Sequence, residues 1–145
     1  MSEILGAEPL YRRVLCGVGH FQPLEDGTVK ISSQAFSDRG MKPSVDRSSL
    51  CPHGPSYSQA DLSDGVVSVL ASGVRGIAAR SVKDGVTISY AIDVFPDPLP
   101  GNPAHAEIRP SPEYATKSAF RKVLEALALL AAWEIYPEEI RSTYQ

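Results

Sequence analysis

Three side chains with acid–base or ion-pairing chemistry alternate with small apolar residues near the end of the chain. The stretch AHAEIRP places His105, Glu107 and Arg109 at every second position. Successive side chains of a strand point to opposite faces, so this spacing predicts a strand with one polar and one apolar face. A carboxylate beside an imidazole raises the pKa of the imidazole. We therefore predict His105 and Glu107 as catalytic residues and Arg109 as a binding residue; the alternative is a half-exposed strand whose polar face meets water.

Four further candidate binding residues lie earlier in the chain, outside any known motif. His20 follows a glycine-rich turn, and Ser33 stands in the predicted strand SSQAF. Asp46 and Arg47 are adjacent opposite charges in a segment rich in Ser, Pro and Gly. Serines near strand ends commonly satisfy backbone groups, and opposite charges in a loop are usually solvated. We predict all four as binding residues on the condition that the fold brings them to one pocket with His105.

Two cysteines and three histidines supply the sulfur and nitrogen ligands that zinc prefers. Cys51 and His53 are separated by one residue in CPHG, and Cys16, His20 and His105 are the remaining ligands of these types. A small cysteine more often packs as a hydrophobic residue, and the Cys-x-His spacing needs partners from elsewhere in the fold. We predict no metal and no cofactor, and we keep a Cys51 and His53 metal site as the alternative.

Several motifs with well-defined chemistry are absent from the sequence. Gly17 and Gly19 begin a dinucleotide-type turn, but Gln22 stands where its third glycine belongs, and no glycine-lysine-serine or glycine-lysine-threonine phosphate loop occurs. The chain also lacks a Gly-x-Ser-x-Gly elbow, a His-Glu-x-x-His helix and paired Cys-x-x-Cys motifs. The families that those motifs identify are therefore excluded.

One loose resemblance to a known family remains. Arg13 or His20 comes first in the chain, Ser32 and Ser33 follow near the second predicted strand, and Glu107 lies on a late strand. This order resembles the Arg or His, Ser, Glu order of ADP-ribosyltransferase-like folds. The resemblance implies that Arg13 or His20 holds a dinucleotide, that Ser33 supports it, and that Glu107 polarises a ribose hydroxyl.

Charge and hydropathy exclude some partners. The formal net charge is −3 and the acids and bases are interspersed, so no basic face for nucleic acid is expected. The longest apolar run, 123–133, is interrupted by Glu125 and is shorter than the ~20 residues of a membrane-spanning helix. The first residues lack the apolar segment of a signal peptide. We expect a cytoplasmic protein with reduced cysteines and no membrane span.

The elements that must position these residues follow from periodicity and turn signals. Alternating or β-branched apolar residues predict strands at 10–16, 28–36, 65–72, 86–95 and 104–109, with 74–82 a strand or an irregular segment. Apolar residues at three- and four-residue spacing after Ser111-Pro112 predict a helix over 112–134. Short helices are predicted near 58–64 and after Pro137, and residues 37–58 read as a long connection.

These elements predict a single α+β domain over residues 1–145, with a mainly antiparallel sheet of about five strands and one long C-terminal helix packed on one face. We hold two classes of function open. The first is a non-catalytic binding or assembly module that meets a protein partner or a small ligand through the loop 37–58 and the proline-rich rim 96–103. The alternative is a small enzyme that acts on a nucleotide, ADP-ribosyltransferase-like or NAD-cleaving.

Overall fold

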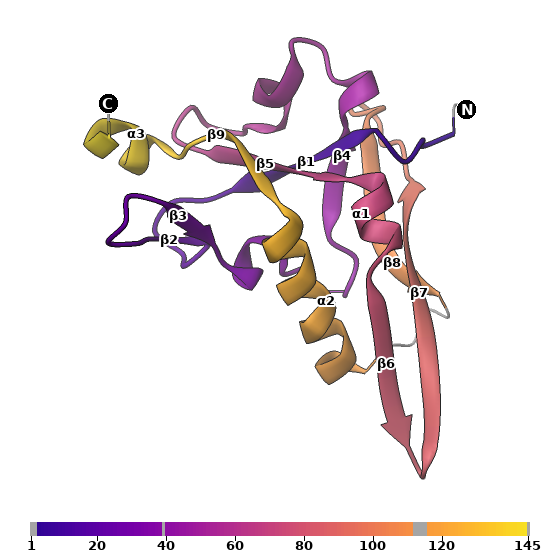
Figure 1. The fold of residues 1–145 in the computed structure, drawn as a ribbon. Coiled ribbons are helices and arrows are strands. Elements are labelled where there is room, and N and C mark those ends of the chain that lie inside the picture. Colours follow the sequence, from indigo (N-terminus) through magenta and orange to yellow (C-terminus); the bar gives the residue numbers. More distant parts are fainter. Residues whose placement is uncertain (1–2, 39, 112–115, 145) are drawn as a thin grey trace.

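The computed structural model describes residues 3–38, 40–111 and 116–144, which form a curled antiparallel sheet with helices (Figure 1). Seven strands lie in the order β6-β7-β8-β4-β1-β5-β9, and β2 and β3 form a separate hairpin. The strands are β1 (Pro9–Val14), β2 (Phe21–Pro23), β3 (Val29–Ile31), β4 (Ser44–Arg47), β5 (Gly65–Leu70), β6 (Ala78–Lys83), β7 (Val86–Pro96), β8 (His105–Ser111) and β9 (Ala132–Ile135). The helices are η1 (Ser33–Phe36), η2 (Ser48–Leu50), η3 (Gly54–Ser58), α1 (Ala71–Arg75), α2 (Lys117–Leu130) and α3 (Glu138–Tyr144), of which the η helices are of the 3-10 type.

The predicted fold class is confirmed in its coarse form, a mixed α/β fold with an antiparallel sheet, and is wrong in detail. The described sheet has seven strands rather than about five. It contains β6, which the sequence leaves open as a strand or an irregular segment, β4, which lies inside the predicted loop 37–58, and β9, which overlaps the predicted end of the long helix; β3, from the predicted strand 28–36, pairs instead with β2. The long helix α2 is followed by β9 and α3, so it is not the C-terminal element. Both missed strands are four residues long and pair with strands distant in sequence, a pairing that local periodicity does not report.

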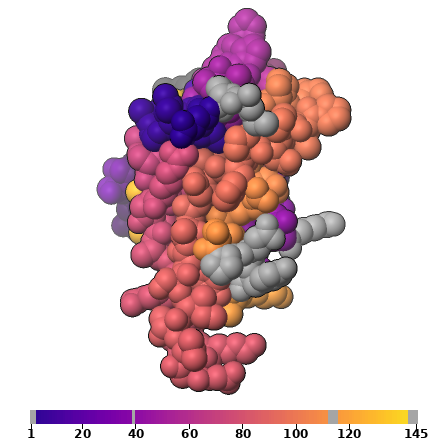
Figure 2. Space-filling view, turned by 90° about the vertical axis from the view of Figure 1, so that its right-hand side faces the viewer, coloured from indigo at the N-terminus to yellow at the C-terminus, as the bar shows by residue number. Residues whose placement is uncertain are grey.

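Consecutive hairpins build one half of the sheet. β6 and β7 are joined at Asp84-Gly85, where both residues have positive φ, 53° and 76°. A two-residue turn of this hand matches the twist of the flanking strands, which explains why an Asp-Gly pair occurs there. The tip of this hairpin stands out from the rest of the molecule (Figure 2). β7 then pairs with β8, and the connection between them is the proline-rich rim.

Thr116 precedes the helix α2 and caps it, since its hydroxyl accepts a hydrogen bond from the N–H of Ala119. A threonine at this position caps the free N–H groups of the first turn. The predicted start at Ser111 is wrong because Ser111 is the last residue of β8, and residues 112–115 lie outside the described residues. The helix ends at Leu130, since Ala131 is extended and the chain continues into β9.

The apolar face of β8 lies in the core, as the alternation in AHAEIRP predicts. Ala104, Ala106 and Ile108 are fully buried, whereas His105, Glu107 and Arg109 are half-buried. The same core holds apolar side chains of both helices α1 and α2 and of β1, β4, β5, β6 and β7. The polar side chains of β8 therefore face away from the core, on the side of the sheet where a site can form.

Candidate functional site

A cleft opens where β1 and β4 part. The two strands pair at only two positions, Leu10 with Arg47 and Tyr11 with Asp46. Beyond Tyr11, β1 continues along β5, while the first half of β4 pairs with β8. The gap is a cleft of about 250 Å³. The polar side chains that line it come from β1, from the turn after β1, from β4, from η3, from the rim and from β8. They are Tyr11, Arg12, Arg13, His20, Ser44, Asp46, Ser58, Asn102 and His105.

Arg12 bridges the gap between the parted strands. Its Nη1 donates to the carbonyl oxygen of Ser44 at 2.8 Å, its Nε to that of Ala35 at 2.9 Å, and its Nη2 to that of Ser37 at 3.1 Å. Burial lowers the pKa of Arg12, against the opposing effect of Asp38. Because these three acceptors are uncharged, the guanidinium brings positive potential to the base of the cleft.

Asp46 forms a polar network on one side of the cleft. Its Oδ2 accepts a hydrogen bond from the Ser58 hydroxyl at 2.7 Å, and its Oδ1 accepts one from Asn102 Nδ2 at 3.0 Å. The amide oxygen of Asn102 in turn accepts from the Tyr57 hydroxyl at 2.7 Å. This network joins the loop 37–58 to the proline-rich rim, and both oxygens of the carboxylate are occupied.

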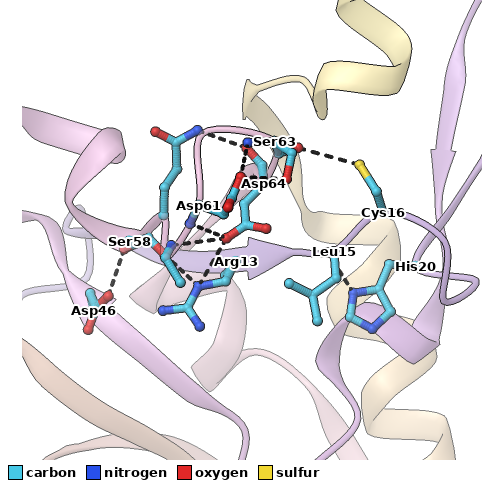
Figure 3. Close-up of polar contacts among 11 residues, drawn as sticks. Arg13, Leu15, Cys16, His20, Asp46, Ser58, Asp61, Ser63 and Asp64 are labelled. Atoms are coloured by element: carbon cyan, nitrogen blue, oxygen red, sulfur yellow. Dashed lines mark hydrogen bonds and ion pairs between the residues drawn. The ribbon is translucent and has the colours of Figure 1, made fainter.

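Arg13 contacts the same residue, Ser58, that donates to Asp46. Its Nε donates to the carbonyl oxygen of Ser58 at 2.8 Å and lies 3.7 Å from Asp64 Oδ2 (Figure 3). Asp64 is itself held by the backbone N–H groups of Ala60 and Asp61. Within the part of the chain that the structure describes, the two terminal amino groups of Arg13 have no hydrogen-bond partner. Those four N–H bonds are available to a ligand.

His20 presents a neutral imidazole to the same cleft. Its Nδ1 accepts a hydrogen bond from the backbone N–H of Leu15 at 3.0 Å, so in the neutral ring the proton lies on Nε2 (Figure 3). Burial lowers the pKa of His20, and the positive charge of Arg12 lowers it further. His20 is therefore an N–H donor at neutral pH.

His105 contacts a carboxylate, but its partner is Asp97 of the rim rather than the predicted Glu107. Nδ1 of His105 lies 2.8 Å from the backbone oxygen of Asp97 and 3.3 Å from its Oδ2. Nε2 lies 3.2 Å from the hydroxyl of Ser44. Both ring nitrogens are thus engaged, one by the rim and one by β4.

The structure brings three of the seven predicted site residues, His20, Asp46 and His105, to this cleft and leaves the other four elsewhere. Ser33 begins η1 and lines a different hollow, beside Lys30 and Glu125. Glu107 pairs with Ser44 in register but is not among the residues that line the cleft. Arg109 lies over the ring of Phe95, with its Cζ 4.2 Å from the ring centroid.

The fourth, Arg47, is a buried structural residue. Only 2% of its side chain is exposed, and its Nη2 lies 3.1 Å from Glu8 Oε1. Its Nε donates to Glu8 Oε2 at 3.3 Å, and the hydroxyl of Ser49 donates to the same oxygen at 2.7 Å. Burial raises the pKa of Glu8, but the hydrogen bonds from Arg47 and Ser49 outweigh this effect, so the pKa lies below its ordinary value.

Acid is expected to destabilise the fold through Glu8. Because the pKa of Glu8 is lower in the folded protein than its ordinary value of 4.5, the ionised carboxylate stabilises the fold above pH 4.5. This contribution is lost as the pH falls below that value and through the folded pKa. Urea unfolding at a series of pH values should therefore give a steeper loss for the wild type than for Glu8→Gln. Equal slopes would contradict the expectation, and the exposed Glu25→Gln is the control that should keep the wild-type slope.

The side chains of the alternative metal site do not form a group of ligands among the described residues. The thiol of Cys16 donates to the backbone oxygen of Ser63, and that of Cys51 to the backbone oxygen of Arg47. Burial, with help from Asp46 and Glu8, raises the pKa of Cys51 to about 12, which keeps the thiol protonated. Over residues 3–38, 40–111 and 116–144, no three His, Cys, Asp or Glu side chains are placed to hold a metal ion.

The residues that sequence reasoning missed are Arg12, Ser44, Tyr57, Ser58, Asp97 and Asn102. Arg13 was a candidate only through the family resemblance.

Comparison with protein-family models, curated proteins and solved structures finds no match to this chain. Among the described helices, none is long and apolar enough to span a membrane.

Proposed function

We propose that this protein is a small-ligand binding module and that the cleft between β1 and β4 takes the carboxylate or phosphate group of an anionic ligand. The observation that carries the proposal is the pair of terminal amino groups of Arg13, which have no hydrogen-bond partner among the described residues of the chain. A guanidinium presents its N–H groups in a planar fork that fits the two oxygens of such an anion.

The surroundings of Arg13 also favour an anion. Arg12 brings a second positive charge to the base of the cleft, and His20 adds an N–H donor. Asp46 is the one acid in the lining, and its two oxygens already accept from Ser58 and Asn102. Asp64 lies 3.7 Å from Arg13 Nε, but its Oδ2 accepts from the backbone N–H groups of Ala60 and Asp61. An incoming anion therefore meets the terminal amino groups of Arg13 and the N–H of His20 rather than unoccupied acceptors.

The geometry favours this proposal over the ADP-ribosyltransferase-like alternative. That alternative needs Ser33 and Glu107 beside the dinucleotide, whereas neither belongs to the lining of the cleft that holds Arg13 and His20. The phosphate group of a nucleotide is also an anion, so NAD is included among the ligands tested for binding.

The proposal is tested by isothermal titration calorimetry with inorganic phosphate, AMP, NAD, acetate and succinate. We expect at least one of these anions to bind, and Arg13→Gln to weaken its binding about 10- to 100-fold, since a hydrogen bond to a charged group contributes about 1.5–3 kcal/mol. Arg80→Gln is the matched control because Arg80 is exposed on β6, away from the cleft, and should leave binding unchanged.

A second measurement locates the anion. Proton NMR titration should show the pKa of His20 rising when the anion binds, because a negative charge near Nε2 favours the imidazolium form. Failure of every anion to bind, or equal binding by Arg13→Gln and the wild type, would contradict the proposal.

A further inference from the structure

Ser44, His105 and Asp97 form a chain of contacts across three segments. The hydroxyl of Ser44 lies 3.2 Å from Nε2 of His105, and Nδ1 of His105 lies 2.8 Å from the backbone oxygen and 3.3 Å from the carboxylate of Asp97. An activated nucleophile consists of a hydroxyl, a base that contacts it and a group that orients the base.

The hydrogen bonds select the tautomer of His105 that general base catalysis needs. A carbonyl oxygen can only accept, so Nδ1 carries the proton that is donated to Asp97. Nε2 then has a free electron pair, and this pair points at the Ser44 hydroxyl. The carboxylate of Asp97 is placed to stabilise the imidazolium that forms when Nε2 takes a proton.

The sheet fixes these positions. β4 and β8 pair with Asp46 opposite His105 and Ser44 opposite Glu107, so Ser44 and His105 are diagonal neighbours on one face. The backbone N–H of Asp97 donates to the carbonyl oxygen of His105 at 2.9 Å, which holds the rim against the start of β8. Ser44 and His105 both line the cleft, and the ring of His105 is mostly buried.

The other nucleophilic side chains near the cleft are less suited to the role. Ser58 donates to Asp46, but only 2% of it is exposed, so a substrate cannot reach it. The thiol of Cys51 is held protonated by its raised pKa of about 12. Ser44 is half-buried and combines access from the cleft with an adjacent imidazole.

We infer that Ser44 is the nucleophile of an acyl-transfer site that hydrolyses an ester carrying an anionic group; this rests on the proposed function, because Arg13 holds that group. The Ser44 oxygen attacks the ester carbonyl carbon while His105 Nε2 takes the hydroxyl proton. The carbon–oxygen bond to the leaving alcohol then breaks, and His105 returns the proton to that alcohol. In the second half, His105 Nε2 takes a proton from water, and the resulting hydroxide attacks the acyl carbon. The bond from that carbon to the Ser44 oxygen breaks, His105 returns the proton to Ser44, and the carboxylic acid leaves.

Two esters test the inference and separate it from the proposed function. 4-Nitrophenyl succinate carries a free carboxylate, and 4-nitrophenyl acetate does not. We expect the wild type to hydrolyse both, and Ser44→Ala and His105→Ala each to lower kcat by about 100-fold or more. Arg13→Gln should raise KM for the succinate ester alone. Ser89→Ala is the matched control, since Ser89 is exposed on β7, and should keep the wild-type rate.

Covalent labelling and a variant of Asp97 complete the test. A fluorophosphonate probe should add to Ser44, as located by mass spectrometry of peptides, and not to Ser44→Ala. Asp97 is a positioning residue, so Asp97→Asn should lower kcat for both esters and leave KM unchanged, because it removes the carboxylate beside the imidazolium that forms on His105. Wild-type turnover in Ser44→Ala, or label elsewhere only, would overturn the inference. Arg13-dependent anion binding without any esterase activity would overturn it and leave the proposed function standing.

Discussion

Arg47→Ala is expected to lower the free energy of unfolding by about 3–5 kcal/mol, the loss typical of breaking a buried ion pair. The substitution removes the guanidinium that contacts both carboxylate oxygens of Glu8, at 3.1 and 3.3 Å. Glu8 is itself only 8% exposed, so its charge would stay buried with Ser49 as a remaining partner. A domain of this size has a total stability of about 5–15 kcal/mol, so this loss is a large part of it.

Urea unfolding followed by circular dichroism measures the loss. The control is Arg80→Ala, an exposed arginine whose removal should change stability by less than about 0.5 kcal/mol. The double variant Arg47→Met with Glu8→Gln should recover part of the loss, because no unpaired charge remains. A loss below about 1 kcal/mol in Arg47→Ala would show that the pair does not stabilise the fold.

The prediction that Arg47 binds a ligand, like its neighbour Asp46, is wrong for a reason that lies in the strand they share. Asp46 and Arg47 were both predicted to bind a ligand, since the segment 37–58 reads as a loop. In the structure they belong to β4, whose alternation sends Asp46 to the cleft and Arg47 to Glu8. The sequence signal that would have separated them, two-residue periodicity over SVDR, is too short to detect among the surrounding prolines and serines.

Local signals predicted the elements that depend on neighbours in the chain. The Asp84-Gly85 turn, the strand 86–95 after it and the two faces of β8 follow from turn chemistry and alternation, and the structure has them. The segment 74–82, left open as a strand or an irregular segment, holds the end of α1 and most of β6. α1 was not expected as a helix because Gly73 disfavours one and the segment is five residues long. Its contacts with β5 and β7, which only the tertiary fold supplies, compensate for this weak propensity.

The candidate site could likewise be predicted only in the part that depends on neighbouring residues in the sequence. The pattern in AHAEIRP identifies His105 as a polar residue on a strand, but its partners come from elsewhere. Ser44 reaches it through the pairing of β4 with β8, and Asp97 reaches it because the rim folds back on the start of β8. Glu107 lies on the same strand and the same face as His105. Two residue rises along the strand separate their side chains, so the ring of His105 is contacted by a partner from another segment.

Leu127→Ala is expected to lower the free energy of unfolding by about 2–5 kcal/mol, because it removes buried methyl groups and leaves a cavity. Leu127 is fully buried in the core, on the same face of α2 as Phe120 and Val123. The three- and four-residue spacing of apolar residues puts Leu127 and Leu130 on one face of the helix, yet Leu130 is 48% exposed. Leu130 is the last residue of the helix and lies beside Gly73 at a hollow on the surface.

The matched control lies two residues along the same helix. Leu129 is 84% exposed, so Leu129→Ala removes the same atoms with the same gain in helix propensity and should change stability by less than about 0.5 kcal/mol. Leu124 is partly buried against the core, and Leu124→Ala should give an intermediate loss. Thermal and urea unfolding of the three variants should therefore rank the losses 127, then 124, then 129. A loss at position 129 equal to that at 127 would mean that α2 packs through a different face.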